Sequence, residues 1–132
     1  TSGGKYIAPP AIEAKFKALC PYVSQFMVFG AERNFVSALI TLDPDAIAGW
    51  ADENGKSGTD YTTLVNDPAV VSMVGDYVDQ LNAQLNRWET IKKWELLDHD
   101  LTIESGELTP SLKVKRNVVQ ANNADLIDGF YS

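Results

Sequence analysis

The segment 104–116 has the residue types and spacing best suited to chemistry. It is a polar run, Glu-Ser-Gly-Glu-Leu-Thr-Pro-Ser-Leu-Lys-Val-Lys-Arg, and it ends in the cations Lys113, Lys115 and Arg116. We expect these cations at the start of a helix, where the positive potential of the helix N-terminus disfavours them. An anionic ligand would account for cations in such a place. A solvated basic loop accounts for them as well, and spacing alone favours this second interpretation.

Two glycine-containing stretches raise the question of a phosphate-binding loop. Gly3-Gly4-Lys5 is too short for the Gly-x-x-x-x-Gly-Lys-Ser/Thr pattern that cradles phosphates. The stretch 55–57 has the Gly-Lys-Ser end of that pattern, but Trp50 stands where the first glycine is needed. We therefore expect no Walker-type nucleotide site in either stretch.

Cys20 and His99 are the single cysteine and the single histidine of the chain. One cysteine cannot form an internal disulfide, and one of each is too few for a Cys/His zinc cage. Cys20 closes an amphipathic segment, so a buried, unreactive thiol is favoured over a Cys–His nucleophile pair. His99 stands between Asp98 and Asp100, which is typical of a solvated loop.

The apolar pattern predicts short strands and helices around these residues. Two runs of aromatic and β-branched residues, 22–29 and 35–42, are joined by a turn and predict a hairpin. Asp-Pro pairs at 43–44 and 67–68 predict helix starts, with aspartate as cap and proline in the first turn. The further predicted elements are a strand at 6–7, a helix at 10–20, an apolar helical stripe from 70 to 88, a strand at 91–97, and a final helix at 114–130, with polar loops at 54–60 and 98–110.

These elements indicate an α+β fold, a small sheet with a central β-hairpin and helices packed on it. A chain of 132 residues fits one domain, and no run of residues is apolar for long enough to span a membrane. The net charge of −7 argues against sequence-independent binding to nucleic acid. The start has neither Met nor an apolar signal region, so we expect a processed chain or an engineered fragment.

The segment 108–116 resembles the final motif of the adenylate-forming enzymes, a superfamily that includes acyl-CoA synthetases, luciferases and the adenylation domains of peptide synthetases. The usual form is Thr-Pro-Ser-Gly-Lys, two residues, then Arg. Leu112 stands here in place of the glycine, while Lys113 keeps its distance from Pro110 and Arg116. The substitution bears on the conformation of the loop, because leucine adopts a positive φ less readily than glycine.

A second segment, 1–9, is similar to the motif that follows the interdomain hinge of the same enzymes. It reads Thr-Ser-Gly-Gly-Lys-Tyr-Ile-Ala-Pro, with Ile12 and Glu13 after it. Together the two segments look most like the long-chain fatty acid:CoA ligases, and the resemblance spans nearly the whole chain. It identifies residues 1–132 as the mobile C-terminal (lid) domain of such an enzyme, with the large N-terminal adenylation domain absent.

The resemblance implies that the parent is a ligase of two domains that uses ATP, Mg²⁺, a fatty acid and CoA. The N-terminal domain would bind ATP, Mg²⁺ and the acyl chain, and an acyl-adenylate would form with release of pyrophosphate. The C-terminal domain would then rotate, so that the thioester with CoA can form. The domain alone is expected to be inactive, and its partner is its own N-terminal domain. The implied location is the cytoplasm, with peripheral association of the full enzyme with the membrane left open.

The resemblance also implies roles for single residues. Lys113 matches the lysine used in adenylation, where an ammonium offsets the charge that builds as a carboxylate attacks the α-phosphate. Gly4 matches the glycine that faces the active site in the thioester-forming state, although an ordinary turn glycine is an equal alternative. Lys5 could meet CoA phosphates. The other matched residues, for which a structural role is at least as good, are Ser111, Arg116 and Glu13.

Two other functions remain open at this point. The chain could be a free-standing protein-interaction module that uses its small sheet and the basic end 113–116. It could also be the same domain from an adenylate-forming enzyme with another carboxylic acid substrate.

Overall fold

The computed structural model describes residues 6–30 and 33–132, which form two compact units. Unit 1 is Thr1–Asp100 and unit 2 is Leu101–Ser132. Unit 1 holds the sheet, and unit 2 holds the polar segment with Lys113. Each unit is described by itself.

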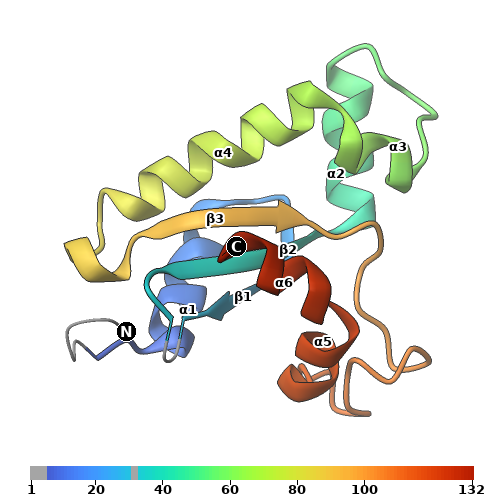
Figure 1. Cartoon of the computed structure of the whole chain (residues 1–132). Helices are drawn as coiled ribbons and strands as arrows, with labels where there is room; N and C mark the ends of the chain where they lie inside the picture. Colours follow the sequence, from blue (N-terminus) through green and yellow to red (C-terminus); the bar gives the residue numbers. More distant parts are fainter. Residues whose placement is uncertain (1–5, 31–32) are drawn as a thin grey trace. The chain divides into compact units, whose positions relative to one another are not determined.

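The sheet of unit 1 has three strands in the order β1-β2-β3 (Figure 1). Strands β1 (Val23–Phe29) and β2 (Val36–Leu42) pair antiparallel, which confirms the predicted hairpin. Strand β3 (Ile91–Leu96) pairs parallel with β2. A parallel pair requires a long crossover, and the three helices between β2 and β3 supply it. Strand β2 is therefore central, and all of its residues are buried.

Three helices of unit 1 begin at the predicted prolines or one residue earlier. These helices are α1 (Pro9–Leu19), α2 (Pro44–Glu53) and α4 (Pro68–Asn82). The carboxylate of Asp43 accepts two backbone N–H groups at the start of α2, and that of Asp67 accepts one at the start of α4. These caps satisfy donors that a helix leaves unpaired at its first turn.

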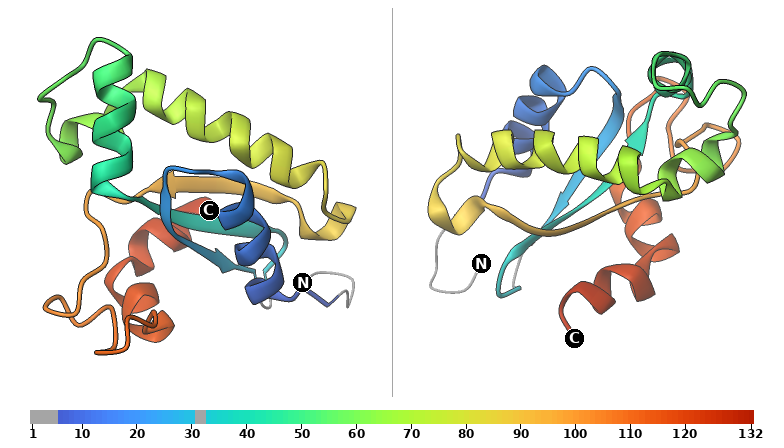
Figure 2. Two further views of the ribbon diagram at one scale, coloured as in Figure 1. Left: turned by 180° about the vertical axis from the view of Figure 1, so that it is seen from behind. Right: turned by 90° about the horizontal axis from the view of Figure 1, so that it is seen from above.

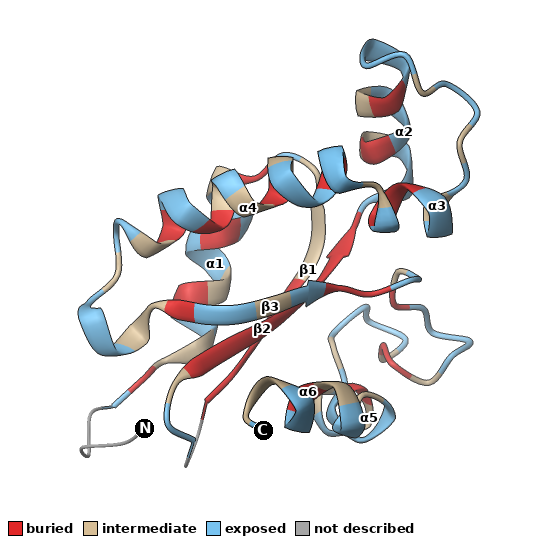
Figure 3. Ribbon diagram, turned by 45° about the horizontal axis from the view of Figure 1, so that its top comes forward, coloured by how far each residue is buried: buried red, intermediate tan, exposed pale blue. Residues whose placement is uncertain are grey.

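The core of unit 1 forms where helices α1 and α4 meet the sheet. Helix α1 lies along β1, α4 contacts β3, and the two helices contact each other (Figure 2). The rings of Phe16 and Phe26 stack with their centroids 4.1 Å apart. Colouring the ribbon by burial shows the buried residues of both helices as interrupted red bands (Figure 3). The buried members of these stripes are Ile12, Phe16, Val70, Val74, Val78 and Leu81.

Two local predictions for unit 1 are wrong. Residues 6–7 form no strand: Ile7 is buried in the core, and the carbonyl of Tyr6 accepts a hydrogen bond from the Trp88 indole. The helical stripe was predicted to run to residue 88, but α4 ends at Asn82. The side-chain amide of Asn82 accepts the N–H of Ile91 at 2.8 Å and donates to its C=O at 3.1 Å. These two bonds connect the C-terminal end of α4 to the first residue of β3.

The sequence also missed two short elements of unit 1, helix α3 (Tyr61–Asn66) and the 3₁₀ turn η2 (Arg87–Glu89). Helix α3 is short and rich in β-branched residues, which weakens its helical signal. Its first turn is capped by the carboxylate of Asp60, which accepts the N–H of Thr63 at 2.8 Å.

Unit 2 ends in two short helices, α5 (Arg116–Asn122) and α6 (Ala124–Phe130), where one helix from 114 to 130 was predicted. Val114 is engaged in a strand-like bridge, so the helix begins two residues later. At the break, Asn123 leaves helical geometry and its side-chain amide donates to the carbonyl of Val119.

The mixture of a three-stranded sheet with packed helices confirms the α+β class. Within residues 6–30 and 33–132, no helix combines the length and the apolar character needed to cross a bilayer.

Candidate functional site: the Lys113 hairpin

The segment around Lys113 is a small, closed hairpin. Leu108 and Val114 form an antiparallel bridge, and the N–H of Thr109 donates to the carbonyl of Lys113 at 2.8 Å. Residues 110–112 are therefore a three-residue loop. Such loops combine a tight turn with a final residue in the left-handed conformation. We call residues 107–115 the Lys113 hairpin.

A side-chain hydrogen bond fixes the loop from within. The hydroxyl of Thr109 accepts the N–H of Lys113 at 3.0 Å and lies 3.0 Å from the hydroxyl of Ser111. The carbonyl of Thr109 also accepts the N–H of Leu112 at 2.8 Å. Thr109 thus bonds to the last loop residue, Leu112, and to Lys113 after it, and so orients the backbone from which the Lys113 side chain projects. Lys113 itself is exposed.

Leu112 occupies the left-handed position of this loop, with φ at +66°. It is the one residue other than glycine with positive φ among those the structure describes. The side chain is 64% exposed. Leucine therefore adopts the backbone conformation that the usual glycine of the motif would adopt more easily.

The base of the hairpin is buried and hydrogen-bonded. Glu107 is 1% exposed, and its carboxylate accepts the hydroxyl of Ser105 at 2.8 Å. The carbonyl of Glu107 accepts the N–H of Lys115 at 2.8 Å. Gly106, with φ at +81°, makes the turn that leads into this strand. The fixed base and the exposed tip together present Lys113 to solvent on a defined backbone.

The predicted cation cluster lies where the sequence analysis expected it, at a helix start. Lys115 is the N-cap of α5 and Arg116 is its first residue, and no acidic residue stands in the first turn. Ser111 and Lys113 therefore lie in the hairpin, and Arg116 follows directly after it as the first residue of α5. The segment thus carries the positive charges of Lys113, Lys115 and Arg116 within four residues.

The remaining predicted site residues lie elsewhere. Gly4 and Lys5 fall outside the described residues. Glu13, on α1, accepts the N–H of Val28 at 2.9 Å and so joins α1 to the edge strand β1. This hydrogen bond gives the Glu13 carboxylate a structural role between α1 and β1.

Sequence analysis missed a polar network at the end of unit 1. The carboxylate of Asp100 accepts the hydroxyls of Ser24 and Thr41, at 2.9 and 2.8 Å, and Thr41 in turn accepts the N–H of Gln25 at 3.0 Å. The network connects β1 and β2 to the segment that follows β3, at the point where the chain leaves unit 1. The sequence pattern Asp98-His99-Asp100 did not predict this network, because Ser24 and Thr41 are far from Asp100 in sequence.

Burial raises the pKa of Tyr61, Cys20 and Tyr77 in unit 1. Desolvation, followed by the nearby carboxylates Asp100, Asp98 and Asp43, raises the pKa of the Tyr61 phenol to about 12, against the lowering effect of its hydrogen bond with Leu42. Burial also raises the pKa of the Cys20 thiol, as expected for an unreactive cysteine.

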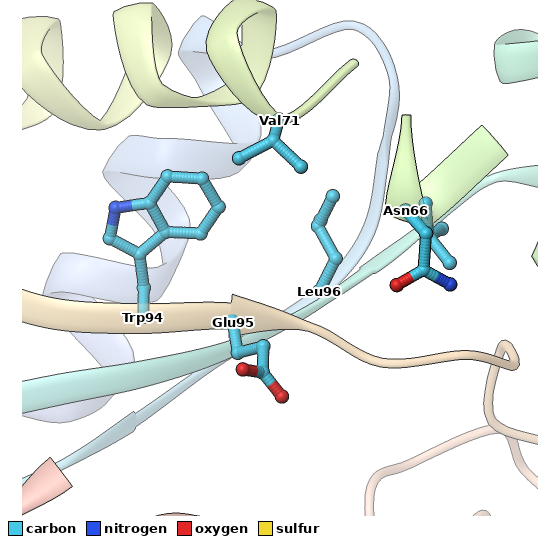
Figure 4. A pocket seen from close by; sticks show the side chains of 6 residues that line it. Asn66, Val71, Trp94, Glu95 and Leu96 are labelled. Atoms are coloured by element: carbon cyan, nitrogen blue, oxygen red, sulfur yellow. The ribbon is translucent and has the colours of Figure 1, made fainter. Parts of the chain in front are cut away.

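A separate cavity of about 350 Å³ lies among α3, α4 and β3 (Figure 4). Trp94, Leu96 and Val71 point into the space between β3 and α4, whereas Glu95 points to the other side of its strand. The cavity is lined by Val65, Asn66, Val71, Trp94, Glu95 and Leu96. It holds none of the predicted site residues, and its apolar side chains offer no acid–base pair.

The described residues also contain no group of three His, Cys, Asp or Glu side chains that could hold a metal ion.

Comparison with known proteins identifies the family. The family model for the C-terminal domain of AMP-binding enzymes matches residues 1–132. The chain belongs to this family. Curated relatives of this AMP-binding C-terminal domain include the long-chain-fatty-acid–CoA ligase FadD15 of Mycobacterium tuberculosis, 39% identical over 133 residues that cover 100% of this chain and 22% of that protein. The peroxisomal long chain acyl-CoA synthetase 6 of Arabidopsis thaliana is 35% identical, over 97% of this chain and 18% of that protein. The chain thus spans about a fifth of the length of these relatives.

Solved structures share the fold. The adenylation domain of a carboxylate reductase from Mycobacterium chelonae superposes with a TM-score of 0.74 and 22% identity, over 99% of this chain and 19% of that one. The A-PCP didomain of a carboxylic acid reductase from Segniliparus rugosus, in complex with AMP, gives a TM-score of 0.73 and 25% identity, over 98% and 16%. The α+β architecture described above is therefore that of known AMP-binding enzymes.

Proposed function

We propose that this chain is the lid domain of a long-chain fatty acid:CoA ligase and that it supplies Lys113 for acyl-adenylate formation. The observation that carries the proposal is the Lys113 hairpin, which holds an exposed lysine on a hydrogen-bonded backbone. The names of the curated relatives support the reaction class. The low share of those relatives that the chain covers supports a large partner domain.

The chemistry follows from the charge that develops in the reaction. As the fatty acid carboxylate attacks the α-phosphate of ATP, negative charge builds on both, and pyrophosphate leaves. A fixed ammonium near these oxygens stabilises that charge more than it stabilises the separate substrates. Lysine suits the task because its point charge on a long stem reaches across a domain boundary.

We assign ATP, Mg²⁺ and the acyl chain to an adenylation domain. The curated relatives are about five times as long as this chain, which leaves room for such a domain. Within the described part of this chain, no cluster of His, Cys, Asp and Glu suits a metal ion. In the second step the lid would rotate and CoA would attack the acyl-adenylate. Gly4, for lack of bulk, and Lys5, for its charge, are proposed to face CoA in that state.

We place the parent enzyme in the cytoplasm. Its free, buried Cys20 is compatible with a reducing compartment. By itself the lid is expected to form no product, because it lacks the surface that binds the substrates.

The test is a Lys113→Ala substitution in the intact parent ligase, with Lys115→Ala as the matched control. Both remove one positive charge from the same hairpin. Pyrophosphate exchange with palmitate should fall by about 10²–10³-fold in Lys113→Ala, the usual loss when one donor to a developing oxyanion is removed. Lys115→Ala should stay within a few fold. Thioester formation from supplied palmitoyl-adenylate should be unchanged in both.

Normal pyrophosphate exchange in Lys113→Ala would contradict the role of the lysine. The acid class is tested separately with a panel of carboxylic acids, because the fold is shared with reductases that act on carboxylates. Activity of the intact enzyme with short or aromatic acids, and none with palmitate, would contradict the fatty acid assignment. Reconstitution of palmitoyl-CoA synthesis from separate adenylation and lid domains would support the division of labour.

A further inference from the structure

The Lys113 hairpin contains a leucine where its backbone favours glycine. The third residue of a three-residue hairpin loop takes the left-handed conformation, and glycine is the residue that does so without a steric penalty. Leu112 takes it at φ +66°, with 64% of its side chain exposed. A single exposed leucine is ordinary on a protein surface. An exposed leucine in a disfavoured backbone conformation is not, because most of its side chain lies in solvent and not in a core.

Backbone strain of this kind clusters at functional sites, where another contact compensates for it. Leu112 lies at the candidate site: it directly precedes Lys113, and the backbone N–H groups of both residues donate to Thr109. Any surface that receives the ammonium of Lys113 must therefore come within reach of the Leu112 side chain.

We propose that Leu112 is a positioning residue for adenylation, whose side chain is buried against the adenylation domain when Lys113 enters the active site. The inference rests on the function proposed above. It commits to one occupant, the adenylation domain of the same protein, because that domain must approach the hairpin for Lys113 to act. The apolar contact would stabilise the adenylation orientation of the lid relative to the thioester-forming one, and so increase the share of enzyme in which Lys113 is placed.

The structure also separates this role from a role in folding. A side chain that is 64% exposed contributes little to the stability of the lid. Replacing it with glycine relieves the left-handed strain, while glycine adds flexibility to the unfolded chain. The two effects oppose each other, so the melting temperature of the 132-residue chain should change little.

The experiment uses Leu112→Gly, Leu112→Asn and Leu112→Met in the intact ligase. Glycine and asparagine tolerate the left-handed conformation but lack the apolar side chain, whereas methionine keeps an apolar side chain of similar volume. The matched control is Ile103→Ala, because Ile103 is also an exposed apolar residue of unit 2, at 43%, and has no positive φ. Each variant is measured by pyrophosphate exchange, by thioester formation from supplied palmitoyl-adenylate, and by thermal unfolding of the 132-residue chain.

We expect Leu112→Gly and Leu112→Asn to lower kcat/KM for pyrophosphate exchange about tenfold, which corresponds to about 1.4 kcal/mol. Leu112→Met and Ile103→Ala should stay within about twofold, and thioester formation should be unchanged in all variants. Leu112→Gly with exchange within twofold of the wild type would overturn the proposal. Equal losses in both half-reactions, or a lowered melting temperature that accounts for the loss, would also overturn it, because they indicate a general structural defect.

Lys113→Ala in the same assay separates this proposal from the one on which it rests. Loss of exchange in Lys113→Ala together with normal exchange in Leu112→Gly would overturn the role of Leu112 alone. Normal exchange in Lys113→Ala would overturn both. If Leu112→Gly left exchange unchanged but weakened binding of the chain to phosphatidylglycerol vesicles, the leucine would face a lipid surface, and the proposed contact would be wrong.

Discussion

Replacement of Asp100 by alanine should destabilise unit 1 more than removal of any other surface charge nearby. The Asp100 carboxylate accepts the hydroxyls of Ser24 and Thr41, which lie on two different strands. Thr41 is fully buried, so its hydroxyl cannot turn to water after the substitution. Ser24 is half-buried and can regain part of its bonding from solvent.

The size of the effect follows from these two contacts. A hydrogen bond to a charged acceptor contributes about 1.5–3 kcal/mol, and a buried donor left without a partner costs its full desolvation. With the whole loss at Thr41 and a partial loss at Ser24, Asp100→Ala should lower the free energy of unfolding by about 2–4 kcal/mol. For a domain of this size, that is a fall in melting temperature of roughly 10 °C.

Urea unfolding of the 132-residue chain measures this, with Asp98→Ala as control. Asp98 carries the same charge two residues earlier, its side chain is 75% exposed, and its contact is with His99. Its removal should cost less than about 0.5 kcal/mol. In a double-mutant cycle, Thr41→Val and Asp100→Ala should couple by at least about 1 kcal/mol. Equal destabilisation by Asp98→Ala and Asp100→Ala, or additive effects in the cycle, would show that the Asp100 hydrogen bonds do not stabilise unit 1.

Two further predictions concern Tyr61 and Thr109. Because the pKa of Tyr61 is about 12 in the folded chain, against 10.0 for an ordinary tyrosine, the unfolded chain loses this proton first as the pH rises from 10 to 12. The free energy of unfolding should therefore be unaffected by Tyr61 below pH 10 and fall above it by about 1–2 kcal/mol, with allowance for the partly exposed ring. Tyr61→Phe should lack this component of the pH dependence. Urea unfolding at a series of pH values measures it, and the same fall of the unfolding free energy above pH 10 in both proteins would contradict the prediction. Thr109→Val removes the acceptor of the Lys113 N–H, so pyrophosphate exchange in the intact ligase should fall about 3–10-fold, while stability changes by less than about 1 kcal/mol because water can replace the lost bond. Thr109→Ser keeps the hydroxyl and should restore exchange; full exchange in Thr109→Val would show that the hydroxyl is not needed.

Local signals in the sequence predicted much of the secondary structure. The Asp-Pro pairs at 43–44 and 67–68 mark helix starts within a residue, because caps are made by neighbours in sequence. The two apolar runs joined by a short turn predict the β1–β2 hairpin for the same reason. For helix α4 the prediction was wrong because a partner distant in sequence intervened. Asn82 ends α4 by bonding to the backbone of Ile91, which no helical periodicity between 70 and 88 could reveal.

The candidate site divides in the same way. The residue types of the segment 108–116 pointed to Lys113, and the family comparison confirms the class of domain to which the motif belongs. The hydroxyl of Thr109 and the buried carboxylate of Glu107 carried no such signal, because threonine and glutamate are common in loops. Their importance comes from where the folded backbone places them.

The α+β class, the main helix starts, the hairpin and the lysine segment could be predicted from the sequence, since each depends on residues close together in the chain. Three features became visible in the folded structure: β3 joins the sheet parallel to β2, Asp100 connects β1 and β2, and Leu112 takes a left-handed conformation with most of its side chain in solvent. These features depend on contacts between distant segments or on backbone geometry that a closed hairpin imposes. Their free energies belong to the folded arrangement and to no single stretch of sequence.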